Sequence, residues 1–286
     1  MKKLILTSNK YSFCIEGHQK LLARHWKDDE ARFTIIGFDQ PDLQLNDNIE
    51  FQCLGKGFND RTPWRDALSP YISSLEEDFF LLVFEDHLLV NDVNLTMMNE
   101  VQTIMESDKS IGKIRMAPAY RDLDNPKPID LPSYNDHFYI GPTTPNSYLP
   151  TSLRPAVWRK ELFLELLHHP AGIKTPHEFE LFNDQLHIDT VVLLPKGEST
   201  IYPEIDAMRF GKPNPIVDNA SDKIDMGYYW LSIDQHDAKI FADMKKAWRA
   251  IAPPEVEKKQ QPQKSRTRRV LSSLRKSALR KLGLKK

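Results

Sequence analysis

Cysteine is scarce in this chain of 286 residues, which contains only Cys14 and Cys53. Two thiols cannot form the disulfide framework of a small secreted domain, nor a zinc site built from cysteines. The scarcity favours a reducing compartment, and we therefore expect a cytoplasmic protein.

Long apolar runs are also absent. The longest covers residues 79–84, whereas a membrane-spanning helix needs about 20 apolar residues. The N-terminal segment is basic, but its apolar stretch is too short for a signal peptide. We therefore expect neither a transmembrane segment nor a secretory leader.

Several short catalytic motifs are missing as well. The chain has no Walker loop, no GxGxxG fingerprint and no GxSxG elbow, which argues against a P-loop kinase, a nicotinamide dehydrogenase and an α/β-hydrolase. None of the nine histidines has a His-x-x-x-His or HExxH spacing. A zinc hydrolase is therefore not expected.

Charge is present in both signs but is unevenly distributed. The chain has 39 Lys and Arg against 40 Asp and Glu, a net charge of −1. Residues 255–286 hold 12 basic and two acidic residues, a net charge of +10, so the preceding 254 residues carry −11. Such a division between an acidic body and a basic tail concerns binding partners rather than fold.

Strand and helix patterns alternate in the first third of the chain. Strands are predicted at residues 3–7, 32–38, 49–53 and 79–84, and helices at residues 14–26 and 64–75. This alternation predicts an α/β fold with a doubly wound, mostly parallel sheet flanked by helices. Ligands of such sheets bind beyond the carboxyl ends of the strands, where Asp39 and Glu85 are expected to lie.

The remainder of the body continues the pattern less regularly. We predict helices at residues 93–105, 159–168, 176–186 and 237–251, with a strand at residues 111–116. Thr175 is expected to cap the third of these helices. Residues 117–150, rich in Pro, Asp, Asn and Tyr, are predicted to form a long ordered loop over a site. The body is expected to end at residue 254, followed by a linker at residues 255–265.

The acidic pair Glu85-Asp86 directly follows the most apolar strand. Two adjacent carboxylates in that position cost free energy to desolvate unless they have partners. A divalent cation or the hydroxyls of a ligand would serve, although the pair could equally cap a turn and face water. His87 alone is more typical of an ordinary polar residue at a strand end.

A second pair of acids, Glu178 and Glu180, flanks Phe179 at the start of a predicted helix. Residues two apart on a helix point about 200° apart, so these acids cannot share one ligand-binding face. One of them can face a cleft while the other caps or pairs at the helix start. A solvated helix start is the plainer interpretation of the same pattern.

Eight segments, taken in order, resemble GT-A-type glycosyltransferases of the family-2-like branch found in bacteria and phages. They are residues 4–7, 34–38, 54–56, 64–68, 80–87, 152–160, 175–180 and 202–212. The resemblance spans residues 1–215. It implies a GT-A-like fold with one domain that uses a nucleotide-sugar donor.

The resemblance also implies roles for particular residues. In such folds an acidic motif after the fourth strand holds Mg²⁺ or Mn²⁺, which makes Asp86 and His87 the metal candidates. Nucleotide contacts are implied for four residues: Asp39, Asp66, Glu85 and Arg154. Glu178 or Glu180 would be the catalytic base, because an acceptor hydroxyl needs a carboxylate to take its proton.

The basic tail has a pattern of its own. Residues 264–286 contain ten Lys and Arg and no acid, and Leu271, Leu274, Ala278 and Leu282 recur at helical spacing. A basic amphipathic helix at residues 266–286 suits an anionic membrane surface. Nucleic-acid binding and a disordered solubilising tail remain as alternatives.

These features predict a cytoplasmic transferase, peripheral on the inner face of the membrane. It would move a sugar from a nucleotide-sugar to a hydroxyl acceptor in surface polysaccharide or lipid-linked glycan synthesis. Two alternatives stay open. The chain could be a phage-type enzyme that glycosylates modified DNA bases, or an inactive module that binds sugars or nucleotides.

Overall fold

The computed structural model describes ten stretches of the chain: residues 1–55, 62–118, 131–141, 151–169, 175–181, 190–196, 200–209, 212–214, 221–225 and 230–251. Its contacts divide the chain into two units, Met1–Trp248 and Arg249–Lys286. The sheet and the site described below lie within the first unit. The predicted linker and basic helix lie outside the described residues.

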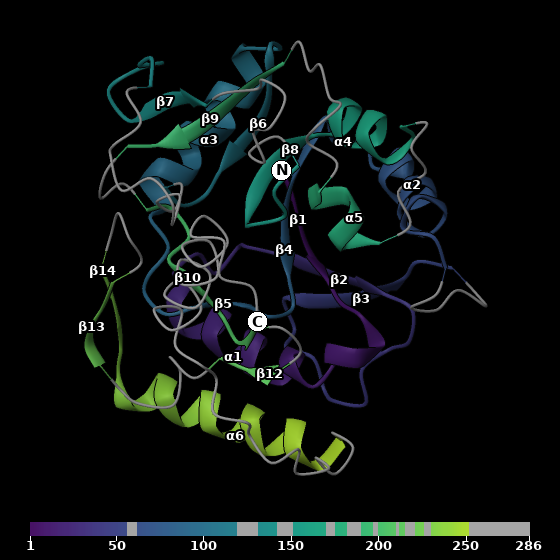
Figure 1. The fold of residues 1–286 in the computed structure, drawn as a ribbon, viewed down its shortest axis with the longest axis vertical. Helices are drawn as coiled ribbons and strands as arrows, with labels where there is room; N and C mark the ends of the chain where they lie inside the picture. The colour runs from purple at the N-terminus through teal and green to yellow at the C-terminus, as the bar shows by residue number, and fades with distance from the viewer. Residues whose placement is uncertain are drawn as a thin grey trace, which may run out of the picture. The chain divides into compact units, whose positions relative to one another are not determined.

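The first unit is organised around a mixed, mostly parallel sheet of eight strands in the order β3-β2-β1-β4-β8-β6-β9-β7 (Figure 1). Their bounds are β1 Lys2–Leu6, β2 Phe33–Gly37, β3 Ile49–Cys53, β4 Phe79–Phe84, β6 Ile111–Arg115, β7 Phe138–Gly141, β8 Ala156–Arg159 and β9 Val191–Pro195. The pairs β3-β2, β2-β1, β1-β4 and β6-β9 are parallel, whereas β8 and β7 run antiparallel to their neighbours. The predicted α/β fold class is confirmed.

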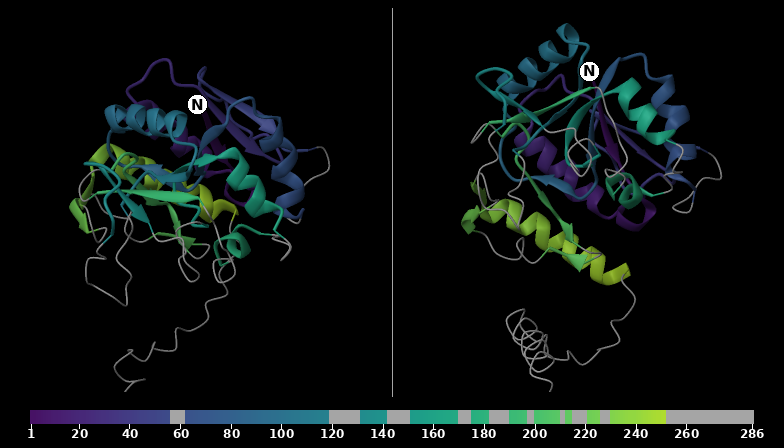
Figure 2. Two further views of the ribbon diagram at one scale, coloured as in Figure 1. Left: turned by 90° about the horizontal axis from the view of Figure 1, so that it is seen from above. Right: turned by 45° about the horizontal axis from the view of Figure 1, so that its top comes forward.

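Helices cover both faces of this sheet. One core cluster joins it to α1 (Cys14–His25), α3 (Leu95–Ser107) and α6 (Gln235–Ile251). A second core cluster joins the sheet to α2 (Trp64–Ser74), α4 (Lys160–Leu167) and α5 (Pro176–Leu181). These three helices group together in Figures 1 and 2.

The central strand β4 shows why the sheet is buried on both faces. Phe79, Leu81 and Val83 belong to the first core cluster, and Phe80 and Leu82 to the second. This alternation follows from the two-residue period of a strand. A continuous apolar run is therefore what a strand covered on both sides requires.

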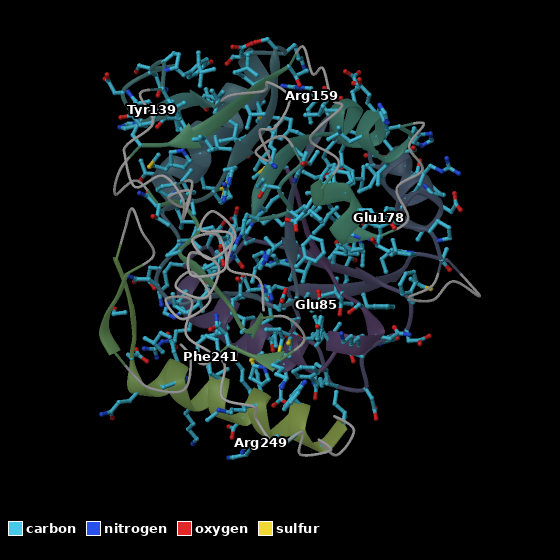
Figure 3. The ribbon with its side chains drawn as sticks, viewed as in Figure 1. Glu85, Tyr139, Arg159, Glu178, Phe241 and Arg249 are labelled. Atoms are coloured by element: carbon cyan, nitrogen blue, oxygen red, sulfur yellow. The ribbon has the colours of Figure 1, made fainter. Side chains whose placement is uncertain are left out.

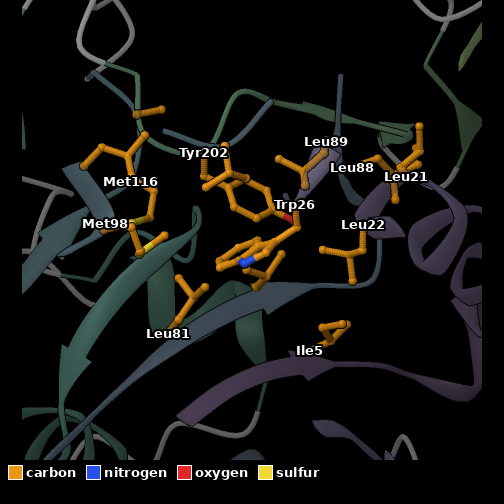
Figure 4. Close-up of a cluster of buried hydrophobic side chains, with 14 of the residues drawn as sticks. Ile5, Leu21, Leu22, Trp26, Leu81, Leu88, Leu89, Met98, Met116 and Tyr202 are labelled. Atoms are coloured by element: carbon orange, nitrogen blue, oxygen red, sulfur yellow. The ribbon is translucent and has the colours of Figure 1, made fainter. Parts of the chain in front are cut away.

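Trp26 organises the first core cluster just beyond the end of α1 (Figure 4). Its ring meets that of Phe33 edge-on, with centroids 5.0 Å apart, and that of Tyr202 at 6.4 Å. Tyr202 precedes a short strand, β10 (Glu204–Asp206), which pairs antiparallel with β5 (His87–Leu89). The core thereby fixes where β10 lies against the acidic end of β4.

Gly17 allows α6 to approach α1 closely. A Cβ atom at that position would lie 2.2 Å from Met244 Sδ and 3.3 Å from Ile240 Cγ2. The absence of a side chain on this turn of α1 therefore makes room for the apolar face of α6.

Smaller elements complete the described part. They are the 3₁₀ helix Asn9–Tyr11 and the paired strands β11 (Met208–Arg209) with β12 (Lys212–Pro213) and β13 (Ser221–Asp225) with β14 (Trp230–Ile233). Among the residues described, no helix combines the length and apolar character needed to cross a bilayer.

Two sequence predictions need correction. Residues 117–150 were expected to form one loop, but β7 occupies Phe138–Gly141 and extends the sheet beyond β9. Arg159 was expected to begin a helix, but it is the last residue of β8, and α4 begins at Lys160. Both strands have four residues, too few for a periodic pattern, and depend on pairing with distant strands.

Candidate functional site

Glu85 connects the ends of two neighbouring strands. Its side chain, 2% exposed, accepts hydrogen bonds from the backbone N–H of Ser8 at 3.1 Å and from Ser8 Oγ at 2.9 Å. The Glu85 N–H donates to the carbonyl of Leu6 at 3.1 Å, and its own carbonyl lies 3.2 Å from Nδ1 of the buried His18. Glu85 therefore fixes the turn after β1 against the end of β4 (Figure 3).

Asp86 follows in a less buried position at the same edge. Burial, with the nearby charges of Glu85 and Asp206, raises the pKa of its carboxyl well above the ordinary value. Its carbonyl accepts a hydrogen bond of 2.7 Å from the N–H of Ala207. Asp86 is thus a carboxyl with a tendency to hold a proton, at the place where the sequence predicted a ligand site.

His87 is uncharged near neutral pH. Burial lowers its pKa to about 3 despite the opposing effect of Asp206. Its Nε2 lies 3.5 Å from Asp206 Oδ1. That contact is therefore one between a neutral imidazole and a carboxylate, not an ion pair.

Arg154 holds two carboxylates opposite the Glu85-Asp86 pair. Its Nη1 donates to Glu204 Oε1 at 3.0 Å and Oε2 at 3.2 Å, and its Nη2 to Asp206 Oδ2 at 2.9 Å. Nη1 also contacts Asp206 Oδ1. A guanidinium presents its donors in a planar fork that suits this arrangement.

Glu204 is buried at 1% exposure. Burial raises the pKa of its carboxyl to about 7, and the charge of Asp206 adds to the rise, whereas Arg154 and Arg115 oppose it. Glu204 is therefore poised to change protonation state near neutral pH. Asp206 is 24% exposed at its side chain and is the more accessible partner of Arg154.

Glu204 and Asp206 were not predicted from the sequence. They reach the site because β10 pairs with β5, which places Asp206 opposite His87 and Glu204 opposite Leu89. The one available signal was the acid-apolar-acid alternation at residues 204–206. A strand of three residues is too short for that alternation to be read with any specificity.

The two acids of α5 diverge, as the helical geometry predicted. Glu180 Oε1 accepts a hydrogen bond from the N–H of Leu153 at 2.9 Å. Glu178 has an exposed side chain, and its N–H is capped by Thr175 Oγ1 at 3.1 Å, which confirms Thr175 as the predicted cap. Glu180 is thus tied to the segment that carries Arg154, and the side chains of both acids are exposed (Figure 3 labels Glu178).

An aromatic cluster brings the start of α2, the end of β4 and α5 together. The Trp64 ring centroid lies 6.0 Å from that of Phe84 and 5.4 Å from that of Phe179. Asp66, in the first turn of α2, is exposed, and its Oδ1 contacts Arg65 Nε at 3.2 Å. Asp66 therefore lies on the α2 side of the edge at which β4 ends.

Asp39 lies at the end of β2, as predicted. Its side chain is exposed, and Oδ2 accepts a hydrogen bond of 2.6 Å from Asn9 Nδ2. Asn9 comes directly after Ser8 in the turn that Glu85 holds. Asp39 is therefore linked to Glu85 through two consecutive residues of one turn.

Two buried basic side chains also lie near this edge, on β6. Lys113 Nζ is 3.9 Å from the centroid of the Trp158 ring and donates to the carbonyl of Ser152 at 2.5 Å. Burial lowers the pKa of Lys113 well below its ordinary value, and the charge of Arg115 lowers it further. Arg115, 1% exposed, adds positive charge near His87 and Glu204.

The described residues do not form a complete metal site. Among them, no group of three or more His, Cys, Asp or Glu side chains is placed to hold an ion. Glu85 is engaged by Ser8 and His87 faces Asp206. Of the acidic motif, Asp86 remains the residue best placed to meet a ligand.

Comparison with known proteins gives distant structural similarity. No protein-family model and no curated protein matches the chain. The structure of S. aureus TarS 1-349 aligns with a TM-score of 0.41 at 15% identity, covering 71% of this chain and 59% of TarS 1-349. The same protein in complex with UDP-GlcNAc gives a TM-score of 0.39 at 14% identity, covering 71% and 57%.

A cytidylyltransferase from Leptospira borgpetersenii aligns at a TM-score of 0.35 and 8% identity, covering 63% of this chain and 68% of the other. This chain spans little more than half the length of the TarS 1-349 chain. At these TM-scores the similarity establishes neither a family nor an activity.

Proposed function

We propose that this chain is a glycosyltransferase that moves a sugar from a nucleotide-sugar donor to a hydroxyl acceptor. The observation that carries the proposal is the acidic edge at the carboxyl ends of β1, β2 and β4. Asp39, Glu85 and Asp86 meet there across the turn formed by Ser8 and Asn9. This is the edge at which open α/β sheets bind their ligands.

The charges at this edge suit a ligand that carries both hydroxyls and phosphates. Asp39 is exposed and can accept hydrogen bonds from the hydroxyls of a ribose. Protonated Asp86 can donate to a phosphate oxygen, which a permanently ionised carboxylate would repel. Arg154 supplies a fixed positive charge that it shares with Glu204 and Asp206.

Sugar transfer requires a group that stabilises the departing nucleoside diphosphate. The acceptor oxygen forms a bond to the anomeric carbon as the bond from that carbon to the phosphate oxygen breaks. The diphosphate leaves with the bonding electron pair and gains negative charge. We assign Arg154 to that charge, because fixed donors aimed at developing charge stabilise a transition state.

The proton of the acceptor hydroxyl needs a base, and we assign this role to one of the two predicted acids, Glu178 or Glu180. Both are exposed on a helix that Phe179 anchors beside Trp64 and so beside the end of β4. The carboxylate would take the proton as the new bond forms.

Whether nucleotide binding requires a divalent cation is tested separately, by adding Mn²⁺ to each nucleotide. Mg²⁺ or Mn²⁺ would neutralise diphosphate charge, and Asp86 would become its protein ligand by losing its proton. Because the described residues do not complete a metal site, we derive no step that passes through a metal.

Thermal shift with nucleotides is the experiment that tests the proposal. UDP and UDP-GlcNAc are the first probes, since TarS has been solved with both, and CTP serves as the comparison ligand. Each is added with and without Mn²⁺. A saturable rise in melting temperature with UDP-GlcNAc, followed by release of UDP when an acceptor is present, supports transfer. No shift with any nucleoside diphosphate or nucleotide-sugar would refute it.

We further propose that residues 266–286 attach the enzyme to an anionic membrane surface, where a lipid-linked or surface-polysaccharide acceptor would be found. Their charge favours such a surface. Removal of residues 258–286 should release the protein from phosphatidylserine vesicles in a flotation assay. Competition by duplex DNA but not by vesicles would instead favour the DNA-modifying alternative.

A further inference from the structure

A polar pocket of ≈ 400 Å³ lies at the other end of α1 from the acidic edge. Its lining residues come from the end of α1, the segment after β5 and the junction of β14 with α6: Arg24, His25, Lys27, Val90, Asn91, Asp92, Ser232 and Asp234. His18 of α1 contacts Glu85, whereas His25 ends the helix. His18 and His25 are seven positions apart, which corresponds to about 10 Å of helix between the two sites.

The walls of this pocket are held in place by hydrogen bonds and ion pairs, of which the contact between His25 and Asp237 is fully buried. His25 Nδ1 lies 3.0 Å from Asp92 Oδ1, and its Nε2 lies 2.9 Å from Oδ2 of Asp237, which is 1% exposed. Arg24 Nε lies 3.1 Å from Asp237 Oδ1, and Arg24 Nη2 contacts Asp234. Side chains from three distant segments are therefore fixed before any ligand arrives, which lowers the entropic cost of binding.

The charges of this pocket balance. Burial lowers the pKa of His25, but the hydrogen bonds to Asp237 and Asp92 outweigh this effect and raise that pKa above its ordinary value. In the lining, the positive charges of Arg24 and Lys27 are matched by the carboxylates of Asp92 and Asp234, and the buried Asp237, outside the lining, contacts Arg24 and His25. A phosphate would meet the carboxylates of Asp92 and Asp234 at close range, and Val90 is the one aliphatic residue among the described residues that line the pocket.

We propose that this pocket binds an uncharged saccharide unit of the acceptor glycan, at a distance from the site of transfer. Sugar hydroxyls both donate and accept, so they match a wall that combines carboxylates, the Asn91 amide, the Ser232 hydroxyl and the Lys27 ammonium. The volume lies in the range of small-molecule sites. The proposal rests on the proposed function, because it takes the ligand to be part of the acceptor.

Ser232→Trp tests the proposal, because an indole at that wall would fill the pocket. The matched control is Ser73→Trp, on the exposed part of α2. Binding of chitotetraose and maltotetraose to the full chain is measured by NMR titration, with inorganic phosphate as a third probe. At least one oligosaccharide should bind saturably to the wild type and to Ser73→Trp, and at least tenfold more weakly to Ser232→Trp.

Saturable phosphate binding without oligosaccharide binding would overturn the proposal, as would equal oligosaccharide binding by Ser232→Trp and the control. So would the absence of oligosaccharide binding in a protein that still shows a melting shift with UDP-GlcNAc. That last result would leave sugar transfer intact, whereas loss of every nucleotide shift refutes the proposed function itself. Circular dichroism spectra of the two tryptophan variants establish that both are folded.

Discussion

Removing the Arg154 guanidinium should destabilise the protein in a way that depends on pH. In Arg154→Ala, Glu204 and Asp206 lose their shared cation. Breaking a buried pair by removing one partner typically costs about 3–5 kcal/mol. Glu204 can offset part of this cost by taking a proton, because burial already raises its pKa to about 7.

The size of the pH effect follows from proton linkage. Arg154 opposes the rise in the pKa of Glu204, so its removal raises that pKa further. At pH 6 the Glu204 carboxyl is mostly protonated in the folded state of both proteins. At pH 8 it is mostly ionised in the folded wild type, whereas the folded variant must still bind a proton there, at a cost in free energy. If the pKa rises by at least one unit, the loss of stability should be about 1 kcal/mol greater at pH 8 than at pH 6.

Urea unfolding at the two pH values measures this difference. Glu204→Gln in the Arg154→Ala background supplies a matched control, because a neutral amide needs no counterion. The double variant should lose the pH dependence and recover part of the stability. An equal loss of unfolding free energy at pH 6 and pH 8, without recovery in the double variant, would show that Arg154 does not stabilise the ionised form of Glu204.

Three further variants test other parts of the structure. Ser8→Ala removes the Oγ donor to Glu85 and should lower the free energy of unfolding by about 2 kcal/mol in urea titrations; no loss would mean that Glu85 does not hold this turn. The raised pKa of His25 gives stability that is fully present below about pH 6.5 and is lost as pH rises through the folded-state pKa. The gap in melting temperature between wild type and His25→Gln should therefore be larger at pH 6 than at pH 9, and the opposite order would contradict it. Gly17→Ala should cost about 1–3 kcal/mol by displacing the Met244 side chain, and less in a Met244→Ala background, so an equal cost in both backgrounds would count against this packing.

The parts of the fold that were predicted from the sequence are those in which local pattern and tertiary role agree. Residues 79–84 form a continuous apolar run and are a central strand with helices on both faces. The run at residues 49–53 alternates, and it forms β3 at the edge of the sheet with four of its five residues at least partly exposed. In both cases the pattern of apolar side chains along the strand indicates whether helices cover both of its faces or leave it partly exposed.

The parts that were missed depend on contacts between distant segments. β8 is buried throughout its four residues, yet its strand conformation depends on insertion between β4 and β6. β10 likewise exists through its pairing with β5. Short strands have no internal hydrogen bonds, so their conformation is decided by their partners.

The candidate site divides in the same way. Asp39 and Glu85 were expected at strand ends because the carboxyl ends of parallel strands share an edge. Asp206 and Glu204 were not expected, since their place opposite Arg154 follows from a pairing across more than 100 residues of chain. The opposite orientations of Glu178 and Glu180 followed from helix geometry, but the choice of Leu153 as the partner of Glu180 did not.

Calorimetric titration of UDP and UDP-GlcNAc into wild type, Asp86→Asn and Asp86→Ala tests the central claim most directly. An amide resembles the protonated carboxyl that burial favours at Asp86 and keeps a hydrogen-bond donor, whereas alanine removes the donor. Without Mn²⁺, we predict saturable binding to the wild type and to Asp86→Asn, and binding at least tenfold weaker to Asp86→Ala. Equal binding by the wild type and Asp86→Ala, or no nucleotide binding by the wild type, would contradict the assignment of the acidic edge as a donor site.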